Sequence, residues 1–151
     1  MQLTRFSDYA LRVLLYAHAA GDRLVTIEEM ATAYGISRAH LMKVVNTLVH
    51  AGFLSAVRGR AGGVTLGKPA DKIRLGDVLR ATEPNFALVE CFSTGRECVI
   101  DGCCKLPRVM RRALAAFLDE FDRHTLASVA LKPREFRSVF GEWEQTEARN
   151  P

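Results

Sequence analysis

The sequence predicts a mainly α-helical protein with a small β-hairpin wing: a winged helix-turn-helix followed by a long C-terminal dimerisation helix. Three observations predict this fold class. Two helical patterns are separated by a very short glycine turn, two β-like runs flank a glycine-rich basic turn, and a wide apolar stripe follows the cysteines near the end of the chain. With 151 residues, of which 48% are hydrophobic, the chain suits one domain with an appendage.

Basic residues are concentrated in the middle of the chain. The formal net charge is +4, and the segment from Ile36 to Arg80 holds eight basic and two acidic residues. This pattern favours a polyanionic partner, nucleic acid first, over an ordinary solvated surface. No apolar run is long enough to cross a membrane and no signal peptide is present, so we expect a cytoplasmic protein without a membrane partner.

The first element is predicted to be an amphipathic helix that runs to about Ala20. Apolar residues recur at helical spacing, Thr4 can cap the N-terminus, and Gly21 can stop the helix. Asp8 and Arg12 stand four residues apart on its polar side, a spacing that favours an ion pair.

A helix-turn-helix is predicted at about residues 26–51. Thr26 begins one helix as part of a capping box, Gly35 ends it, and Ser37 caps the next. A generic surface helix could carry the polar residues of the second helix, but the tight turn and the basic surroundings favour a recognition helix. The side chains that can bond phosphates and base edges are Arg38, His40, Lys43, Asn46 and Thr47.

A wing is predicted at about residues 53–67, where two short β-like runs flank a glycine-rich turn. Arg58 and Arg60 can reach phosphates or a minor groove, and Gly62 and Gly63 allow close approach of the backbone. Residues 1–83 therefore form the predicted DNA-binding region.

Residues 84–131 are predicted to form a cysteine loop and a dimerisation helix. Pro107 suits a first helical turn, and the apolar stripe from Leu106 to Phe121 is wide for a chain of this size to cover. Packing against the first helix is the alternative. A dimer would match the two-fold symmetry of a palindromic operator. The polar, weakly patterned residues 132–151 are predicted to be a flexible tail.

All the cysteines lie in one loop: Cys91, Cys98, Cys103 and Cys104. Grouped thiolates are soft ligands for zinc or iron–sulfur clusters. The spacing lacks the paired C-x2-C knuckles of structural zinc and favours a cluster, with a disulfide or thiol switch and unligated cysteines as alternatives. Because Cys103 and Cys104 are adjacent, we expect only one of them to be a ligand. No dinucleotide fingerprint or acid–base constellation is present, so an enzyme is not expected.

Two stretches carry a family resemblance: the run that begins Tyr34-Gly-Ile-Ser-Arg-Ala-His, and the wing Val57-Arg-Gly-Arg-Ala-Gly-Gly. Together with the cysteine loop, they resemble the bacterial iron–sulfur winged-helix transcriptional regulators of the NsrR, IscR and RirA type, over about residues 1–131. The opening Gln2-Leu-Thr-Arg-Phe-Ser-Asp-Tyr is most similar to the nitric-oxide-sensitive NsrR type.

The resemblance implies a homodimeric repressor whose affinity for a double-stranded DNA operator is controlled by an iron–sulfur cluster sensitive to nitric oxide. A [4Fe–4S] cluster is favoured over [2Fe–2S]. The implied ligands are Cys91, Cys98, Cys104 and Asp8 of the partner subunit. Cys103 is an alternative ligand, and Arg12 and Glu83 are expected beside the cluster.

Alternatives to nitric-oxide control follow from the same residues. Pro107 stands where the IscR type has a histidine, while Glu90-Cys-Phe and the long first cysteine gap are similar to the RirA type. The alternative is therefore an iron- or redox-responsive regulator of the same family, or a zinc or thiol-switch regulator.

Overall fold

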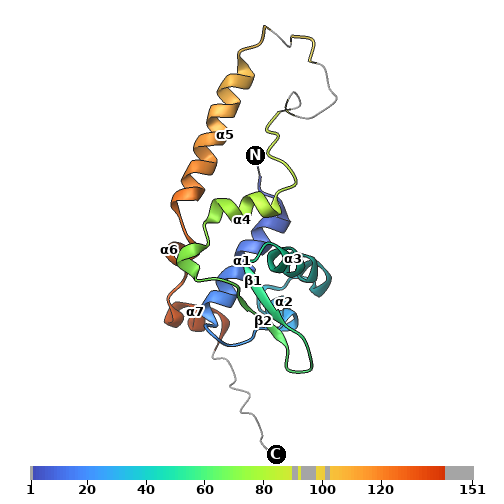
Figure 1. Ribbon diagram of the computed structural model, residues 1–151, viewed down its shortest axis with the longest axis vertical. Coiled ribbons are helices and arrows are strands. Elements are labelled where there is room, and N and C mark those ends of the chain that lie inside the picture. The colour runs from blue at the N-terminus through green and yellow to red at the C-terminus, as the bar shows by residue number, and fades with distance from the viewer. Residues whose placement is uncertain (1, 90–91, 93–97, 101–102, 142–151) are drawn as a thin grey trace, which may run out of the picture.

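The computed structural model describes residues 2–89, 92, 98–100 and 103–141. Its elements form a body that carries the wing at one end, and helix α5 projects from this body at the other (Figure 1). In chain order the elements are α1 Arg5–Ala19, α2 Ile27–Tyr34, α3 Arg38–His50, β1 Leu54–Val57, β2 Gly63–Leu66, the 3-10 turn η1 Ala70–Lys72, α4 Leu75–Thr82, α5 Leu106–Arg123, α6 Leu126–Val129 and α7 Pro133–Phe140.

The first three helices begin and end where local signals predict. The hydroxyls of Thr4, Thr26 and Ser37 each accept a hydrogen bond from the backbone N–H three residues later. These bonds satisfy amides that have no partner inside the helix. Gly35 has φ +63°, a left-handed conformation that glycine adopts without steric cost. The turn between α2 and α3 is therefore short and fixed in direction.

The core lies where α1, α2, α3 and α4 meet the inner face of the wing. Figure 1 shows α1 at the centre of this arrangement. Most of the fully buried side chains are aliphatic and lie on the predicted apolar stripes: Val13, Leu14, Met30, Leu41, Val44, Leu48, Val78 and Leu79. The amphipathic patterns in the sequence thus correspond to one continuous hydrophobic core.

Strands β1 and β2 form the predicted antiparallel hairpin, with Leu54 opposite Leu66 and Val57 opposite Gly63. A third segment, which no pattern in the sequence predicts, joins this hairpin. Val25 exchanges two backbone hydrogen bonds with Val64, at 2.9 and 2.8 Å. The loop between α1 and α2 is thereby bound to the base of the wing, and the wing cannot swing independently of the helices.

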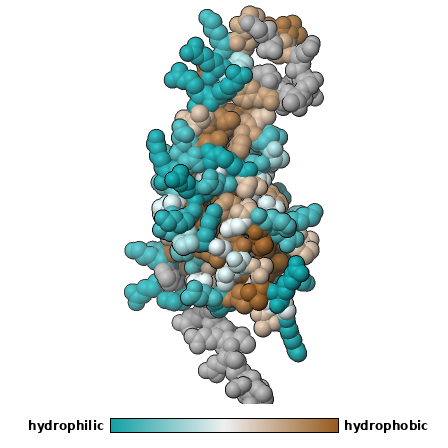
Figure 2. All heavy atoms as spheres, viewed as in Figure 1, coloured by the Kyte–Doolittle hydropathy of each residue, from teal (hydrophilic) through white to brown (hydrophobic). Residues whose placement is uncertain are grey.

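Helix α5 matches its prediction in extent, with Pro107 in its first turn. Its main partner is α4, and it does not lie along α1. None of its residues is buried in the single chain, and Leu106 and Val109 are 49% and 60% exposed. Figure 2 shows brown and tan apolar atoms along this projecting part, between teal charged side chains. No helix among the described residues is long and apolar enough to cross a bilayer.

The C-terminal segment differs from the predicted flexible tail. Residues 133–140 form α7, and Phe136 is only 2% exposed because it packs into the hydrophobic core against Tyr16 of α1. Its ring lies edge-on to Tyr16, with centroids 5.0 Å apart, and Phe140 lies edge-on to Tyr34 at 5.1 Å. Two aromatic residues one turn apart are enough to dock a short helix, although the rest of its sequence is polar. Residues 142–151 lie outside the described residues.

Candidate nucleic-acid interface and candidate cluster site

Helix α3 presents the predicted recognition residues to solvent. Its other face is buried through Leu41, Val44, Val45 and Leu48, and this burial fixes which side points outward. Of the five predicted residues, Thr47 is half-buried and the other four are exposed: Arg38, His40, Lys43 and Asn46. The arrangement offers a cationic and amide-bearing surface of the kind that reads a major groove.

One of these residues already has an acidic neighbour. Arg38 Nε lies 3.6 Å from Glu28 Oε2 on α2, and both side chains are about 70% exposed. An ion pair so exposed contributes at most about 1 kcal/mol. A phosphate can therefore displace Glu28 from Arg38 at little cost.

The wing turn displays Arg58 and Arg60 in solvent. Gly59 adopts φ +121° and its carbonyl accepts a hydrogen bond from Gly62 N at 3.0 Å, which closes the turn. A Cβ atom on Gly62 would lie 2.3 Å from the carbonyl oxygen of Val57. Gly62 is thus required by contacts within the chain, a reason that the sequence analysis did not identify.

Gly63 has a similar role. A Cβ atom there would lie 2.8 Å from the carbonyl oxygen of Val25, on the strand-like segment that flanks the wing. The wing is also fixed to the end of α3, because Phe53 N donates to Leu48 O and Gly67 N donates to Phe53 O, both at 2.9 Å. The base of the wing is therefore fixed relative to α3.

At the other end of α1, Asp8 and Arg12 form the ion pair that their spacing predicts. Arg12 Nε lies 3.1 Å from Asp8 Oδ1, and the second guanidinium nitrogen lies 2.8 Å from Oδ2. Both side chains are a little under half exposed, Asp8 at 46% and Arg12 at 43%. Both oxygens of the predicted ligand are therefore engaged, but water can still reach them.

Arg12 links this pair to the helix-turn-helix. Its guanidinium lies 6.0 Å from the centre of the Tyr34 ring, and the Tyr34 hydroxyl donates a hydrogen bond to Arg12 O at 3.0 Å. Burial raises the pKa of Tyr34 to about 12, and the positive charge of Arg12 only partly opposes this shift. The hydroxyl therefore stays protonated at neutral pH. Tyr34 is the last residue of α2, immediately before the turn.

Glu83 lies beside the first turn of α1. Its Oε1 accepts hydrogen bonds from Thr4 N at 2.8 Å and from Thr4 Oγ1 at 3.1 Å. The adjacent Thr82 hydroxyl is 2.8 Å from the Ser7 hydroxyl. The end of α4 is thus tied to the start of α1, and Glu83 contacts the turn that precedes Asp8 but not Arg12.

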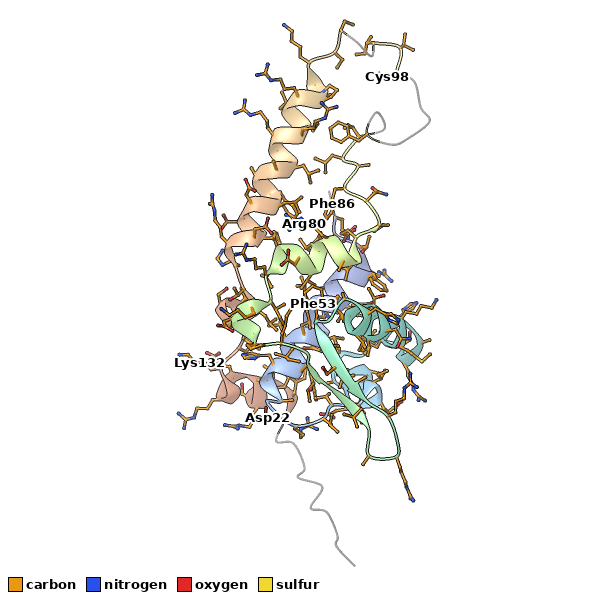
Figure 3. All side chains as sticks on the ribbon, in the orientation of Figure 1. Asp22, Phe53, Arg80, Phe86, Cys98 and Lys132 are labelled. Carbon is orange, nitrogen blue, oxygen red and sulfur yellow. The ribbon has the colours of Figure 1, made fainter. Side chains whose placement is uncertain are left out.

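Cys98 lies at the end of the molecule remote from the wing (Figure 3). Cys98 and Cys103 are exposed, Cys104 is half-buried, and none of these three is in a disulfide. Cys103 Sγ is 3.2 Å from Ile100 O. Cys91 lies outside the described residues, so the structure does not describe the predicted ligand set as a whole.

The donor types suit an iron–sulfur cluster, because thiolates and a carboxylate are ligands that iron accepts. These donor atoms do not come together within the part of the chain that the structure describes. There, no three residues among His, Cys, Asp and Glu lie close enough together to hold a metal ion. This absence concerns the described residues alone, and Cys91 is not among them.

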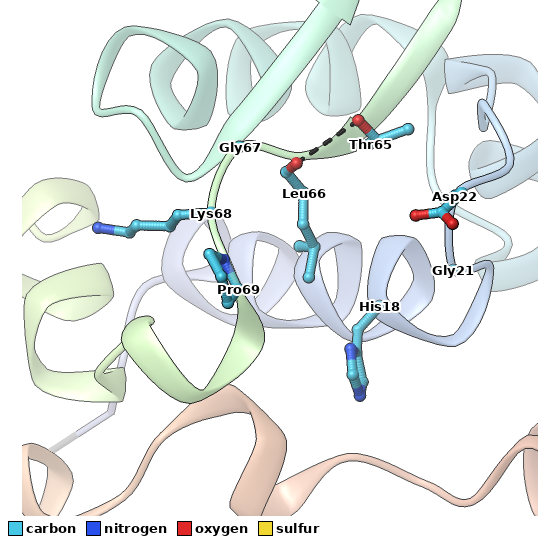
Figure 4. Close-up of a pocket in the computed structure, with 8 residues that line it drawn as sticks. All are labelled: His18, Gly21, Asp22, Thr65, Leu66, Gly67, Lys68 and Pro69. Carbon is cyan, nitrogen blue, oxygen red and sulfur yellow. Dashed lines mark hydrogen bonds between the residues drawn. The ribbon is translucent and has the colours of Figure 1, made fainter.

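A pocket of about 460 Å³ lies between the end of α1 and the segment that follows β2 (Figure 4). No motif in the sequence indicates it. Its ionisable lining residues are His18, Asp22 and Lys68, and it contains no cysteine. Asp22 and Cys98 lie at opposite ends of the molecule (Figure 3). The pocket is therefore separate from the candidate cluster site.

Comparisons with known proteins agree with this geometry. A family model described as Rrf2, iron-dependent transcriptional regulator, matches residues 3–132. A transcriptional regulator from Listeria innocua is 28% identical, with a TM-score of 0.69 over 85% of each chain. The oxidized form of CymR from Staphylococcus aureus is 26% identical, with a TM-score of 0.68 over 87% of this chain and 98% of that one. IscR from T. potens is 22% identical over 85% of each chain, with a TM-score of 0.66, which shows a likeness of fold.

Proposed function

The chain belongs to the Rrf2 family of DNA-binding transcriptional regulators, and we propose that it is a dimeric repressor controlled by an iron–sulfur cluster that reacts with nitric oxide. As a member of this family it is a transcription factor and not an enzyme. The observation that carries the proposal is the donor set. Grouped cysteines follow a basic winged helix, and a water-accessible carboxylate, Asp8, lies on the first helix.

DNA contact divides between two surfaces. The exposed residues of α3 enter the major groove, and Arg58 and Arg60 bind phosphates or the adjacent minor groove. Because the wing and α3 are held together by backbone hydrogen bonds, both contacts are made in one docking step. A symmetric dimer presents two such surfaces to a palindromic operator.

A second copy of the chain covers the apolar stripe of α5. A helix with this much exposed apolar surface is unfavourable in water. The stripe contains Leu106, Met110, Leu114, Phe117 and Phe121, and none of these side chains is buried in one chain. Pairing two α5 helices is the simplest way to bury it, and it also supplies the second copy that the ligand set needs.

The proposed ligands are Cys91, Cys98 and Cys104 of one chain and Asp8 of the partner subunit. Cys104 is favoured over Cys103 because it is half-buried next to the start of α5, while the Cys103 thiol faces Ile100 O. These residues would hold a cluster, with [4Fe–4S] as the favoured type, whose iron would react with nitric oxide. An oxygen ligand among sulfurs is expected to be the more readily displaced one.

Asp8 has two competing partners under this proposal. Ligation takes at least one carboxylate oxygen from Arg12, and loss of ligation returns it. Arg12 in turn contacts Tyr34, which ends α2 at the turn before α3. Ligation of Asp8 thus affects the recognition helix through two contacts, Asp8 with Arg12 and Arg12 with Tyr34. Coupling of this kind is typically about 1–3 kcal/mol, or a 5–150-fold change in affinity.

The experiment uses protein purified without oxygen and an operator duplex enriched by this protein from a randomised DNA library. Fluorescence anisotropy measures binding before and after additions of nitric oxide, for wild type, Asp8→Ala, Cys98→Ala and the control Asp22→Ala. We expect nitric oxide to weaken binding of wild type and control only. If both Asp8→Ala and Cys98→Ala bind and respond as wild type does, the proposal is wrong.

A thiol switch is the second candidate function. The described cysteines are free, Cys98 and Cys103 are exposed, and Cys103 adjoins Cys104. The similarity to an oxidized form of CymR supports this candidate. A colourless protein that loses DNA binding with peroxide and regains it with a thiol reductant would favour the switch. A coloured protein that ignores nitric oxide but loses binding on iron chelation would favour an iron-responsive regulator.

A further inference from the structure

Helix α5 is attached to the body at its C-terminal end. We call this attachment the α4–α5 joint and define it by Gly76, Arg80 and Asp122. Figure 3 shows Arg80 where α4 meets α5. The rest of α5 has no buried residue in the single chain, so its direction relative to the body depends on the joint.

A two-pronged ion pair forms the joint. The two terminal nitrogens of Arg80 each bind a different oxygen of Asp122, both at 2.6 Å. A fork of this kind fixes orientation as well as distance, because two parallel hydrogen bonds cannot both be kept when one helix rotates against the other. The hydrogen bonds from Arg80 also hold the pKa of Asp122 below its ordinary value, and the pair remains charged at neutral pH.

Gly76 makes the close approach possible. A Cβ atom at this position would lie 1.9 Å from Asp122 Oδ1 and 2.9 Å from an Arg80 guanidinium nitrogen. Gly76 is the second residue of α4 and lies in its first turn. Its presence is explained by the carboxylate that rests against it.

Backbone hydrogen bonds extend the joint on both sides. Leu75 N donates to His124 O at 3.0 Å, and Leu126 N donates to Ile73 O at 2.8 Å. The chain that leaves α5 therefore runs beside the chain that enters α4. These bonds hold the two segments together, while the ion pair sets the angle at which α5 departs.

Small changes at this joint have large effects at a distance. With 18 residues, α5 is about 27 Å long at 1.5 Å per residue. A rotation of about 10° at the joint moves the far end by about 5 Å, given that length. This exceeds the step of about 3.4 Å between base pairs. Seen from α5, the same rotation moves the body that carries α3 and the wing.

We propose that Gly76, Arg80 and Asp122 are positioning residues that set the separation of the two recognition helices, and so the half-site spacing that the dimer accepts. The inference rests on the proposed pairing of α5 helices and on DNA reading by α3. It adds that spacing is specified at a place that touches neither the DNA nor the proposed cluster.

The test enriches duplexes from a randomised DNA library with full-length wild type, Asp122→Asn, Gly76→Ala and the control Glu120→Gln. Glu120 pairs with Arg123 and His124, at the end of its own helix, so its substitution removes an equal charge without affecting α4. We expect all four proteins to enrich the same half-site sequence. The two joint variants should accept shifted or broadened spacings and bind the wild-type spacing about tenfold more weakly, comparable with a mismatched base pair.

A double variant separates the steric role of Gly76 from general damage. The three atoms nearest to a Cβ at position 76 all belong to Asp122 and Arg80, so Gly76→Ala should add no further change of spacing in an Asp122→Ala background. Loss of the half-site sequence itself, or unchanged spacing in Asp122→Asn and Gly76→Ala, would overturn the inference. If wild type is monomeric or enriches no two-fold sites, the proposed function fails and this inference fails with it. If wild type behaves as proposed and only the variants do not, the inference alone is wrong.

Discussion

Replacing Phe136 with alanine should strongly destabilise the protein, although this residue lies in a segment whose sequence predicts a tail. Phe136 is 2% exposed and its ring contacts Tyr16 and Phe140, with centroids 5.0 and 4.5 Å away. Truncation of a buried phenylalanine costs about 3–5 kcal/mol, out of a total stability of about 5–15 kcal/mol. For a chain of this size, the melting temperature should fall by about 10 °C.

Val139→Ala is the matched control, because it shortens an apolar side chain of the same helix that is 67% exposed. Thermal and urea unfolding followed by circular dichroism at one protein concentration would compare the variants. We expect Val139→Ala to unfold within about 1 °C of wild type, as surface substitutions usually do. If Phe136→Ala also unfolds there, α7 does not belong to the cooperative core, and the reasoning from its burial is refuted.

Three further predictions concern the wing and the body. Gly62→Ala should distort the wing turn, because its Cβ would lie 2.3 Å from Val57 O. DNA affinity measured by fluorescence anisotropy should therefore fall. The control Ala61→Ser, at an exposed position, should bind DNA as wild type does. Removing Arg58 and Arg60 together should lower the slope of log affinity against log salt by about 2, because each arginine that neutralises a phosphate adds about 1 to it; an unchanged slope would place the wing away from the phosphates. For Glu29, burial raises the pKa, but hydrogen bonds from Arg23 and Tyr16 outweigh it and hold the pKa below 4.5. The stability that these hydrogen bonds add is present above pH 4.5 and is lost as the pH falls through the lower pKa of Glu29 in the folded protein. The difference in melting temperature between wild type and Glu29→Gln should therefore shrink in acid. A difference that stays constant from pH 7 to pH 3 would contradict this.

Elements with local signals could be predicted from the sequence. Hydroxyl caps and left-handed glycines mark α2 and α3, and the burial of Leu41 and Leu48 confirms which face of α3 is turned inward. The hairpin follows from its β-like runs and glycine turn. The ion pair of Asp8 with Arg12 follows from their spacing on one helix.

Features that depend on residues distant in sequence were not predictable. The bonds between Val25 and Val64 join the wing to a segment that carries no strand pattern long enough to recognise. Nothing in the sequence around Gly76 reveals that Asp122, more than forty residues later, will rest against it. The short helix α7 is stabilised by tertiary packing and not by its own propensity.

The candidate site likewise has a part that could be predicted from local sequence and a part that could not. The recognition face depends on helical periodicity, which one chain already contains. The proposed gathering of the cysteines with Asp8 would involve a second copy of the chain, which the spacing of residues along one chain does not determine. The described residues of one chain contain no group of three His, Cys, Asp or Glu side chains that could hold a metal ion. Gly62 and Gly63 were expected to allow approach to DNA, and the structure gives them an additional role in closing the wing onto the body.

Asp8, Arg12 and Tyr16 follow one another at one-turn intervals along α1, and they serve different parts of the molecule. Asp8 is the proposed ligand, Arg12 reaches the end of α2, and Tyr16 contacts the aromatic side chains of α7. Changes at successive turns of this one helix therefore affect three parts of the protein. Over evolutionary time α1 should drift more slowly than its half-exposed surface would suggest, because each accepted substitution calls for compensating changes in segments far from it along the chain.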